Sequence, residues 1–142
     1  MPISLSRCWV LLLASLVPLA AGCGGNANVL RVTGTVRSAG KPVPNLLVHF
    51  VPEQGRPSWG STDEQGAFEL SFDRKTKGAL RGRHKVFVTY RPRDAAEEMV
   101  VSQNESALPA GLRLILKRYS ERETTLQVEI TKEGQVVELN LD

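Results

Sequence analysis

The strongest constraint on the fold is an alternation of apolar and polar residues, which runs from Val29 almost to the C-terminus. Successive side chains of a β-strand point to opposite faces, so this two-residue period indicates strands with one buried face. Glycine, proline, asparagine and aspartate interrupt the pattern where turns are expected. We therefore predict seven short strands, at residues 29–37, 45–52, 59–62, 67–72, 81–90, 125–131 and 136–141.

Strands of this length and spacing favour an all-β fold, a seven-stranded antiparallel sandwich of about 100 residues in which each sheet has one packed and one solvated face. The 142 residues suit a single domain, and a (β/α)8 barrel would need about 250. We expect an insertion at about 92–121 to interrupt the sandwich. Within it, Asp94 is a suitable N-cap for a two-turn helix, and the apolar segment 112–119 is suited to docking on the sandwich.

The first 22 residues are predicted to be a secretory signal peptide, so we exclude them from the fold. A basic residue, Arg7, precedes an apolar run of 14 residues from Cys8 to Ala21, and small residues end the run. A permanent spanning helix needs roughly 20 apolar residues, so this run, which also contains Pro18, is short for a transmembrane anchor.

The end of this run, the segment LAAGC from Leu19 to Cys23, resembles the lipobox of bacterial lipoproteins. The resemblance implies that the chain is cleaved before Cys23 and that acyl chains on Cys23 anchor the mature protein in a membrane. Residues 23–28 then form a flexible tether, and Gly24 favours the outer membrane, facing the periplasm or the cell surface. Cys8 is the only other cysteine, so the mature chain has no thiol left for a disulfide or a metal site.

Several further segments resemble the carboxypeptidase regulatory-like domain, which has a transthyretin-like (prealbumin-like) Greek-key fold. The segment TDEQGAF at 62–68 resembles its Thr-Asp-x-x-Gly-x-Phe turn, and GRHKVFV at 82–88 resembles its Gly-x-Tyr-x-Val-x-Val strand, with His84 in place of the tyrosine. The matching segments near the start are residues 32–36, 40–45 and 48–52. The chain is similar to small lipoproteins of this type found in planctomycetes. The resemblance covers about 29–142 and implies an architecture, not an activity.

No pattern of catalytic or metal-binding residues stands out in the sequence. The only two histidines, His49 and His84, are expected on an outer strand face and at an inner rim, and neither lies in a zinc-binding motif. The turn at Asp63 and Glu64 lacks the alternating oxygen ligands of a calcium loop. We therefore expect no catalytic residue, no metal and no cofactor.

One surface feature indicates binding. Strand alternation places Arg81, Arg83, Lys85 and Arg91 on one face, together with Phe87, and no acidic residue occurs between positions 74 and 93. Such a face suits an anionic polysaccharide, lipid headgroups or an envelope protein. The formal charge of +3 does not indicate nucleic acid. The same charges also suit a solvated face that prevents edge aggregation. The sequence leaves open whether a second cluster lies nearby, formed by Arg113, Lys117, Arg118 and Arg122.

These features favour a membrane-anchored, non-catalytic binding or adhesion module of the bacterial cell envelope. A structural component that self-associates in the envelope is an alternative. A transthyretin-like hydrolase is a remote one, because the histidine and arginine constellation and the serine-rich C-terminal signature of that enzyme are missing from this sequence.

Overall fold

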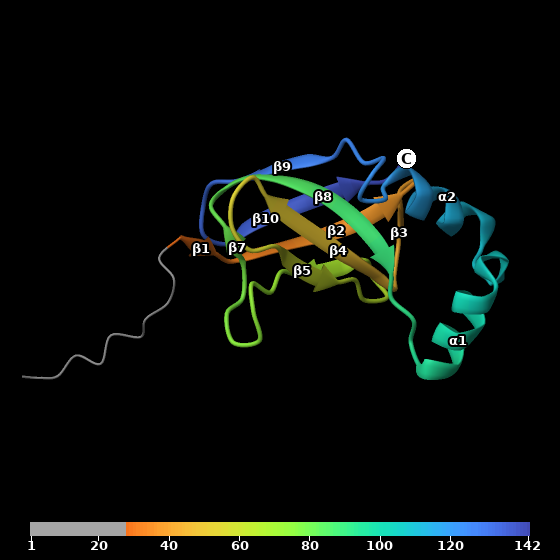
Figure 1. Ribbon diagram of the computed structural model, residues 1–142. Helices are drawn as coiled ribbons and strands as arrows, with labels where there is room; N and C mark the ends of the chain where they lie inside the picture. Colours follow the sequence, from red (N-terminus) through yellow and green to blue (C-terminus); the bar gives the residue numbers. More distant parts are fainter. Residues whose placement is uncertain (1–27) are drawn as a thin grey trace, which may run out of the picture.

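A computed structural model describes residues 28–142 (Figure 1). The predicted signal peptide, the lipidation of Cys23 and all but the last residue of the predicted tether lie outside the described residues. Within the described part the chain forms mostly β-strands, with two α-helices that both fall in the predicted insertion. The all-β prediction is therefore confirmed for the body of the protein.

The first four-stranded sheet is built around β2 (Val32–Ser38). β10 (Gln135–Asn140) pairs with β2 along one edge. β6 (Ala67–Glu69) and β3 (Lys41–Pro42) pair with different parts of β2 along the other edge. The first and last long strands of the described chain therefore lie side by side.

The second four-stranded sheet has the order β5–β4–β8–β9 and is antiparallel throughout. Its strands are β5 (Ser58–Ser61), β4 (Leu46–Pro52), β8 (Gly82–Tyr90) and β9 (Gln127–Ile130). A separate pair joins β1 (Val29–Leu30) to β7 (Ala79–Leu80). Each of the seven predicted strands has a counterpart. The predicted strand 29–37 is divided at Arg31 into β1 and β2, and β3 and β7 are two-residue strands that the sequence did not predict.

The inward faces of the two four-stranded sheets share one hydrophobic core. Phe50 of β4 is fully buried, and its ring centroid lies 6.2 Å from that of Phe68 in β6, so the sheets meet around this pair. Val36 in β2 and Val86 and Val88 in β8 are also buried, on the faces that the alternation predicts. The two-residue period therefore identified the core side of both sheets correctly.

One strand pair corrects the antiparallel prediction. β10 runs parallel to β2, with Val137 opposite Gly34 and Leu139 opposite Val36. Alternation defines which side chains face the core and carries no information on the direction of the neighbouring strand. Glycine at position 34 allows the close approach, because a Cβ there would lie 2.3 Å from the carbonyl oxygen of Val137 and 2.5 Å from the ring of Phe68.

The insertion folds into helices at one end of the body, opposite β1 (Figure 1). It contains α1 (Ala95–Gln103), a 3-10 turn η1 (Glu105–Ala107) and α2 (Ala110–Arg118). Asp94 caps α1 as predicted, since its Oδ1 accepts a hydrogen bond from the backbone N–H of Glu97 at 2.8 Å. Tyr119 follows α2 and is buried, and its carbonyl accepts a hydrogen bond from the N–H of Val88 at 3.0 Å. The segment 112–119 therefore docks on the sheet as predicted.

Candidate functional site

The basic face predicted from the sequence lies on the outer side of β8. Arg83 and Lys85 are exposed and alternate with buried residues of the core, while Arg81 and Arg91 flank the strand and are also exposed. Phe87 lies on the same outer side and is partly exposed. The structure therefore brings the five residues together along one strand, and we call this surface the β8 face.

Two cations of the β8 face are held by backbone carbonyl groups. The guanidinium of Arg81 donates a hydrogen bond to the carbonyl of Thr131. The Nζ of Lys85 donates to the carbonyl of Glu121 at 2.5 Å. A carbonyl contact orients a cation without cancelling its charge, so both side chains keep a positive charge that can attract an anion.

Acidic residues from other strands approach the β8 face, which the sequence did not reveal. The register of β8 and β9 places Glu129 directly opposite Arg83. The carboxylate of Glu53 lies 4.0 Å from the guanidinium of Arg83. Both partners of that pair are well exposed, so the interaction is weak and screened by salt. Of the four cations on this face, Arg83 is therefore the one whose positive charge is most offset by nearby carboxylates.

A row of rings crosses the middle of the same sheet surface, and sequence reasoning missed it. The register places His49 of β4 between Trp59 of β5 and Phe87 of β8. The rings of His49 and Phe87 stack with centroids 4.3 Å apart and planes 8° apart, so each ring covers a face of the other. Burial lowers the pKa of His49, against the opposing effect of the Glu121 carboxylate. His49 therefore adds little positive charge at neutral pH.

The second histidine belongs to the core. His84 is fully buried on the inner side of β8, and its Nε2 donates a hydrogen bond to the carbonyl of Leu80 at 2.7 Å. Its Nδ1 has no hydrogen-bond partner among the described residues. The inner position predicted for His84 is therefore correct, and no nucleophile or acid is hydrogen-bonded to it within residues 28–142.

A groove of about 830 Å³ lies between α1 and the nearby strand ends. Apolar side chains of the loop after β3, of α1 and of α2 line much of it, among them Val43, Val100 and Leu112. Val100 is 55% exposed, as is the neighbouring Met99 at 62%. Polar residues also line this groove, but Tyr90, Arg93 and Glu97 among them are hydrogen-bonded to one another.

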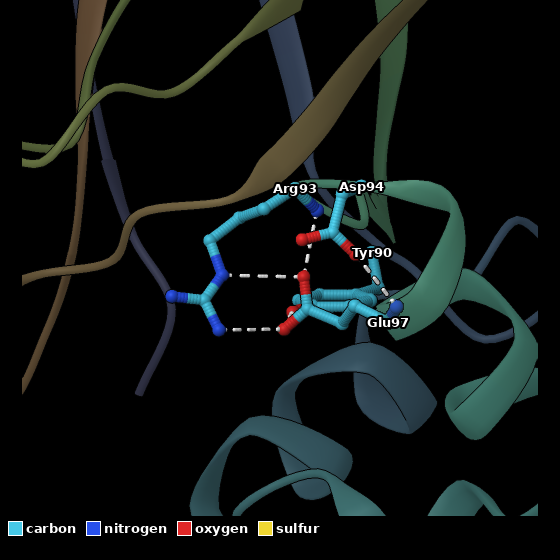
Figure 2. A network of polar contacts seen from close by, with 4 residues as sticks. All are labelled: Tyr90, Arg93, Asp94 and Glu97. Carbon is cyan, nitrogen blue, oxygen red and sulfur yellow. Dashed lines mark hydrogen bonds and ion pairs between the residues drawn. The ribbon is translucent and has the colours of Figure 1, made fainter.

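A polar network in the wall of this groove ties α1 to the end of β8 (Figure 2). The Oε1 of Glu97 accepts hydrogen bonds from the Tyr90 hydroxyl at 2.9 Å and from Nη2 of Arg93 at 3.1 Å. Its Oε2 accepts one from the backbone N–H of Arg93 at 2.6 Å. These bonds, first those from the Arg93 side chain, lower the pKa of Glu97 from 4.5 to about 2. Since α1 has no buried residue, these hydrogen bonds are what attach the helix to the end of β8. The network therefore has a structural role.

The second basic cluster is divided between two sides of α2. Arg113, Lys117 and Arg122 line one groove of about 690 Å³. Arg118 lies on another side, with its guanidinium carbon 5.7 Å from the centre of the Tyr119 ring. The sequence grouped these four residues, whereas the structure assigns only three of them to a common surface, which we call the α2 groove.

Within residues 28–142, no three side chains of histidine, cysteine, aspartate or glutamate come together as metal ligands. No helix in this range is long and apolar enough to cross a membrane. Comparisons with protein-family models, curated proteins and solved structures found no match to this chain.

Proposed function

We propose that this protein is a lipid-anchored, non-catalytic binding module of the bacterial cell envelope, with a carboxypeptidase regulatory-like Greek-key sandwich as its body. The positions of the matching segments support this fold. Residues 32–36 form most of β2 and residues 82–88 form most of β8. The turn between β5 and β6 is built as its sequence requires, since Asp63 Oδ1 accepts hydrogen bonds from two backbone N–H groups and Gly66 has a φ of +73°.

The β8 face is the observation that carries the binding proposal. Four cationic side chains follow the outer face of β8, and only Arg83 has a carboxylate within 4.0 Å among the described residues. Cations aligned in this way sum their fields and attract a polymer with repeated negative charges. We therefore propose an anionic polymer of the envelope as the partner, in preference to a small substrate.

The proposed anchor and the shape of the domain are compatible. Acyl chains on Cys23 would hold the chain at the membrane, and only five residues separate Cys23 from Val29 at the start of β1. β1 lies at one end of the domain and the helices lie at the other (Figure 1). In this proposal the helical end points away from the anchoring membrane, and the β8 face runs between the two ends.

Capture of envelope components tests the proposal directly. The mature lipidated protein is incubated with its native envelope fraction at low and high salt, and bound material is identified. We expect capture at low salt, and we expect the triple variant R81E/R83E/K85E to lose it. The matched control K41E/K75E/K132E changes the net charge equally at exposed positions outside β8 and is expected to retain capture.

Two results would contradict this function. Capture that is unchanged in the β8-face variant would show that this face is not the binding surface. Mass spectrometry that finds an unmodified Cys23 in an uncleaved chain would remove the anchor from the proposal.

A self-associating envelope component is the second candidate, and one observation favours it. β10 is the edge strand of its sheet in the described structure, and its Val136 is 68% exposed. Exposed edges of this kind can pair with a second copy. Sedimentation analysis of the mature protein separates the two candidates, since the binding proposal expects a monomer and self-association expects an oligomer that V136K disrupts.

A further inference from the structure

The α2 groove is lined by three cations and two carboxylates, and none of these cations forms a close ion pair within the described chain. Arg113 and Lys117 are four residues apart on α2, so they lie on the same side of the helix, and Arg122 joins them from the following loop. Glu105 and Glu123 line the same groove. None of the three cations has a carboxylate within 4.0 Å in the described chain. Three cations against two carboxylates leave an excess of one positive charge in the groove, which an anion would balance.

Arg113 also has an unsatisfied donor in this groove. Its Nε is buried and has no hydrogen-bond partner among residues 28–142. Buried donors of charged groups are normally paired, because an unpaired one loses its hydration without compensation. The guanidinium is a fork of donors that matches carboxylate, sulfate or phosphate oxygens. Because Nε itself is inaccessible to solvent, we expect an anion in the groove to contact this guanidinium through its terminal Nη groups.

The α2 groove and the β8 face meet at the loop after α2. Lys85 of the β8 face donates its 2.5 Å hydrogen bond to the carbonyl of Glu121. Ser120 and Arg122, the neighbours of Glu121 in the chain, line the α2 groove. The cations thus continue from Arg81 along β8 to Lys85 and then across one loop to α2. The sequence left open whether the second basic cluster lies near the first. This contact shows that three of its four residues, all but Arg118, lie on a surface adjacent to the β8 face.

We infer that the β8 face and the α2 groove form one track, and that its ligand is an extended anionic polysaccharide which occupies both at once. This inference rests on the proposed function and names its ligand class. A single small anion would satisfy only one cluster, whereas a flexible chain with repeated charges follows a track that passes from a strand to a helix. Engagement of both clusters by one chain raises its affinity by effective concentration.

Polar groups between the cations favour a sugar polymer. Gln127 lies opposite Lys85 in the sheet register, and Ser120 lines the groove. Amide and hydroxyl groups at these positions match sugar hydroxyls that lie between charged groups. Lipid headgroups fit less well, because α2 and β1 lie at opposite ends of the domain (Figure 1). The membrane that holds the anchor would therefore face the end of the domain away from α2.

Oligogalacturonates of increasing length test the track, with binding to the mature lipidated protein in detergent measured by calorimetry. We expect chains long enough to reach both clusters to bind at least about tenfold more tightly than the dimer. Neutral dextran of the same length should not bind. Equal affinity for the dimer and the long chain would overturn the single track, as would absence of binding to any charged chain.

Variants on α2 locate the second half of the track. R113Q/K117Q should reduce the affinity for the long chain to about that of the dimer, a loss of at least about tenfold, while dimer binding stays unchanged. R118Q is the matched control, because Arg118 lies on the same helix but over the Tyr119 ring. An equal loss in R118Q would overturn the inference. Circular dichroism and thermal unfolding confirm that each variant is folded.

The same experiment separates the inference from the function on which it rests. If R81E/R83E/K85E abolishes binding of the long chain and R113Q/K117Q leaves it unchanged, the β8 face remains the binding surface and the single track is wrong. If neither variant changes the binding, both the proposed surface and the track are wrong.

Discussion

The β-sheet body and the helical insertion of this protein are held together by different forces. In the body, Val48 and Phe50 are fully buried, and the core runs through both four-stranded sheets. In the insertion, α1 has no buried residue and depends on its Asp94 cap and on the Glu97 network. Met99 on the same helix remains 62% exposed.

This difference indicates two levels of stability within one domain. Burial of apolar surface is the dominant stabilising term, so unfolding of the body should be global and cooperative. Hydrogen bonds at an exposed site contribute little net free energy, so α1 should open locally at a lower cost. α2 lies between these extremes, because Ile115 and Leu116 pack against the core while Leu114 is 69% exposed. The insertion can therefore adapt to a ligand without unfolding the body.

Truncation of a core ring should show the largest difference in stability between the body and the insertion. We expect F50A to lower the free energy of unfolding by about 3–5 kcal/mol, because it leaves a cavity where the two sheets meet. The matched truncation L114A in the insertion should change it by less than about 0.5 kcal/mol. Urea denaturation measures both, and similar losses would show that the insertion contributes to the core as much as the body does.

Two glycines should respond to a methyl group in opposite directions. G34A should destabilise the protein by about 1–3 kcal/mol, because the added Cβ collides with the backbone of β10 and with Phe68. In α2, a Cβ at Gly111 meets no atom within 4 Å. G111A should therefore stabilise the protein by up to about 1 kcal/mol through helix propensity. Stabilisation by G34A would refute the close approach of β2 and β10.

Loss of the α1 cap should affect only the insertion. We expect D94A to destabilise α1 by about 1 kcal/mol, because the side chain of Asp94 no longer accepts the Glu97 N–H. Hydrogen exchange of the amides in residues 95–103 should accelerate, while that of β4 and β8 stays unchanged. D94N keeps an acceptor oxygen and serves as the control. Faster exchange in the body would show that the two regions unfold together.

Acid should release α1 at a pH that leaves the core intact. The folded-state pKa of Glu97 is about 2, below its ordinary value of 4.5, so its contribution is complete above pH 4.5 and disappears as the pH falls through about 2. Carbon-13 NMR of the Glu97 carboxyl group should titrate near 2, and the amide signals of α1 should shift with it. E97Q should remove this transition. A midpoint near 4.5 would contradict the network.

The sequence was informative wherever a residue's position depends on its close neighbours in the chain. Alternation identified the buried sides of β2 and β8, Asp94 was recognised as a cap, and Asp63 with Gly66 indicated a tight turn. Each of these features depends on a repeat or a hydrogen bond that spans only a few residues. The row formed by Trp59, His49 and Phe87 was missed, because it exists only once three strands are placed in register.

By itself, the sequence determined the longer strands, their buried faces and the set of cations on β8. The reason is that the two-residue period of a strand is a local property of the chain. Tertiary structure alone decided that β10 runs parallel to β2, that Glu53 and Glu129 approach Arg83, and that Lys85 reaches the loop beside the α2 groove. These contacts join residues that are distant in the chain. Their partners are selected by the packing of the whole core, which no local pattern encodes.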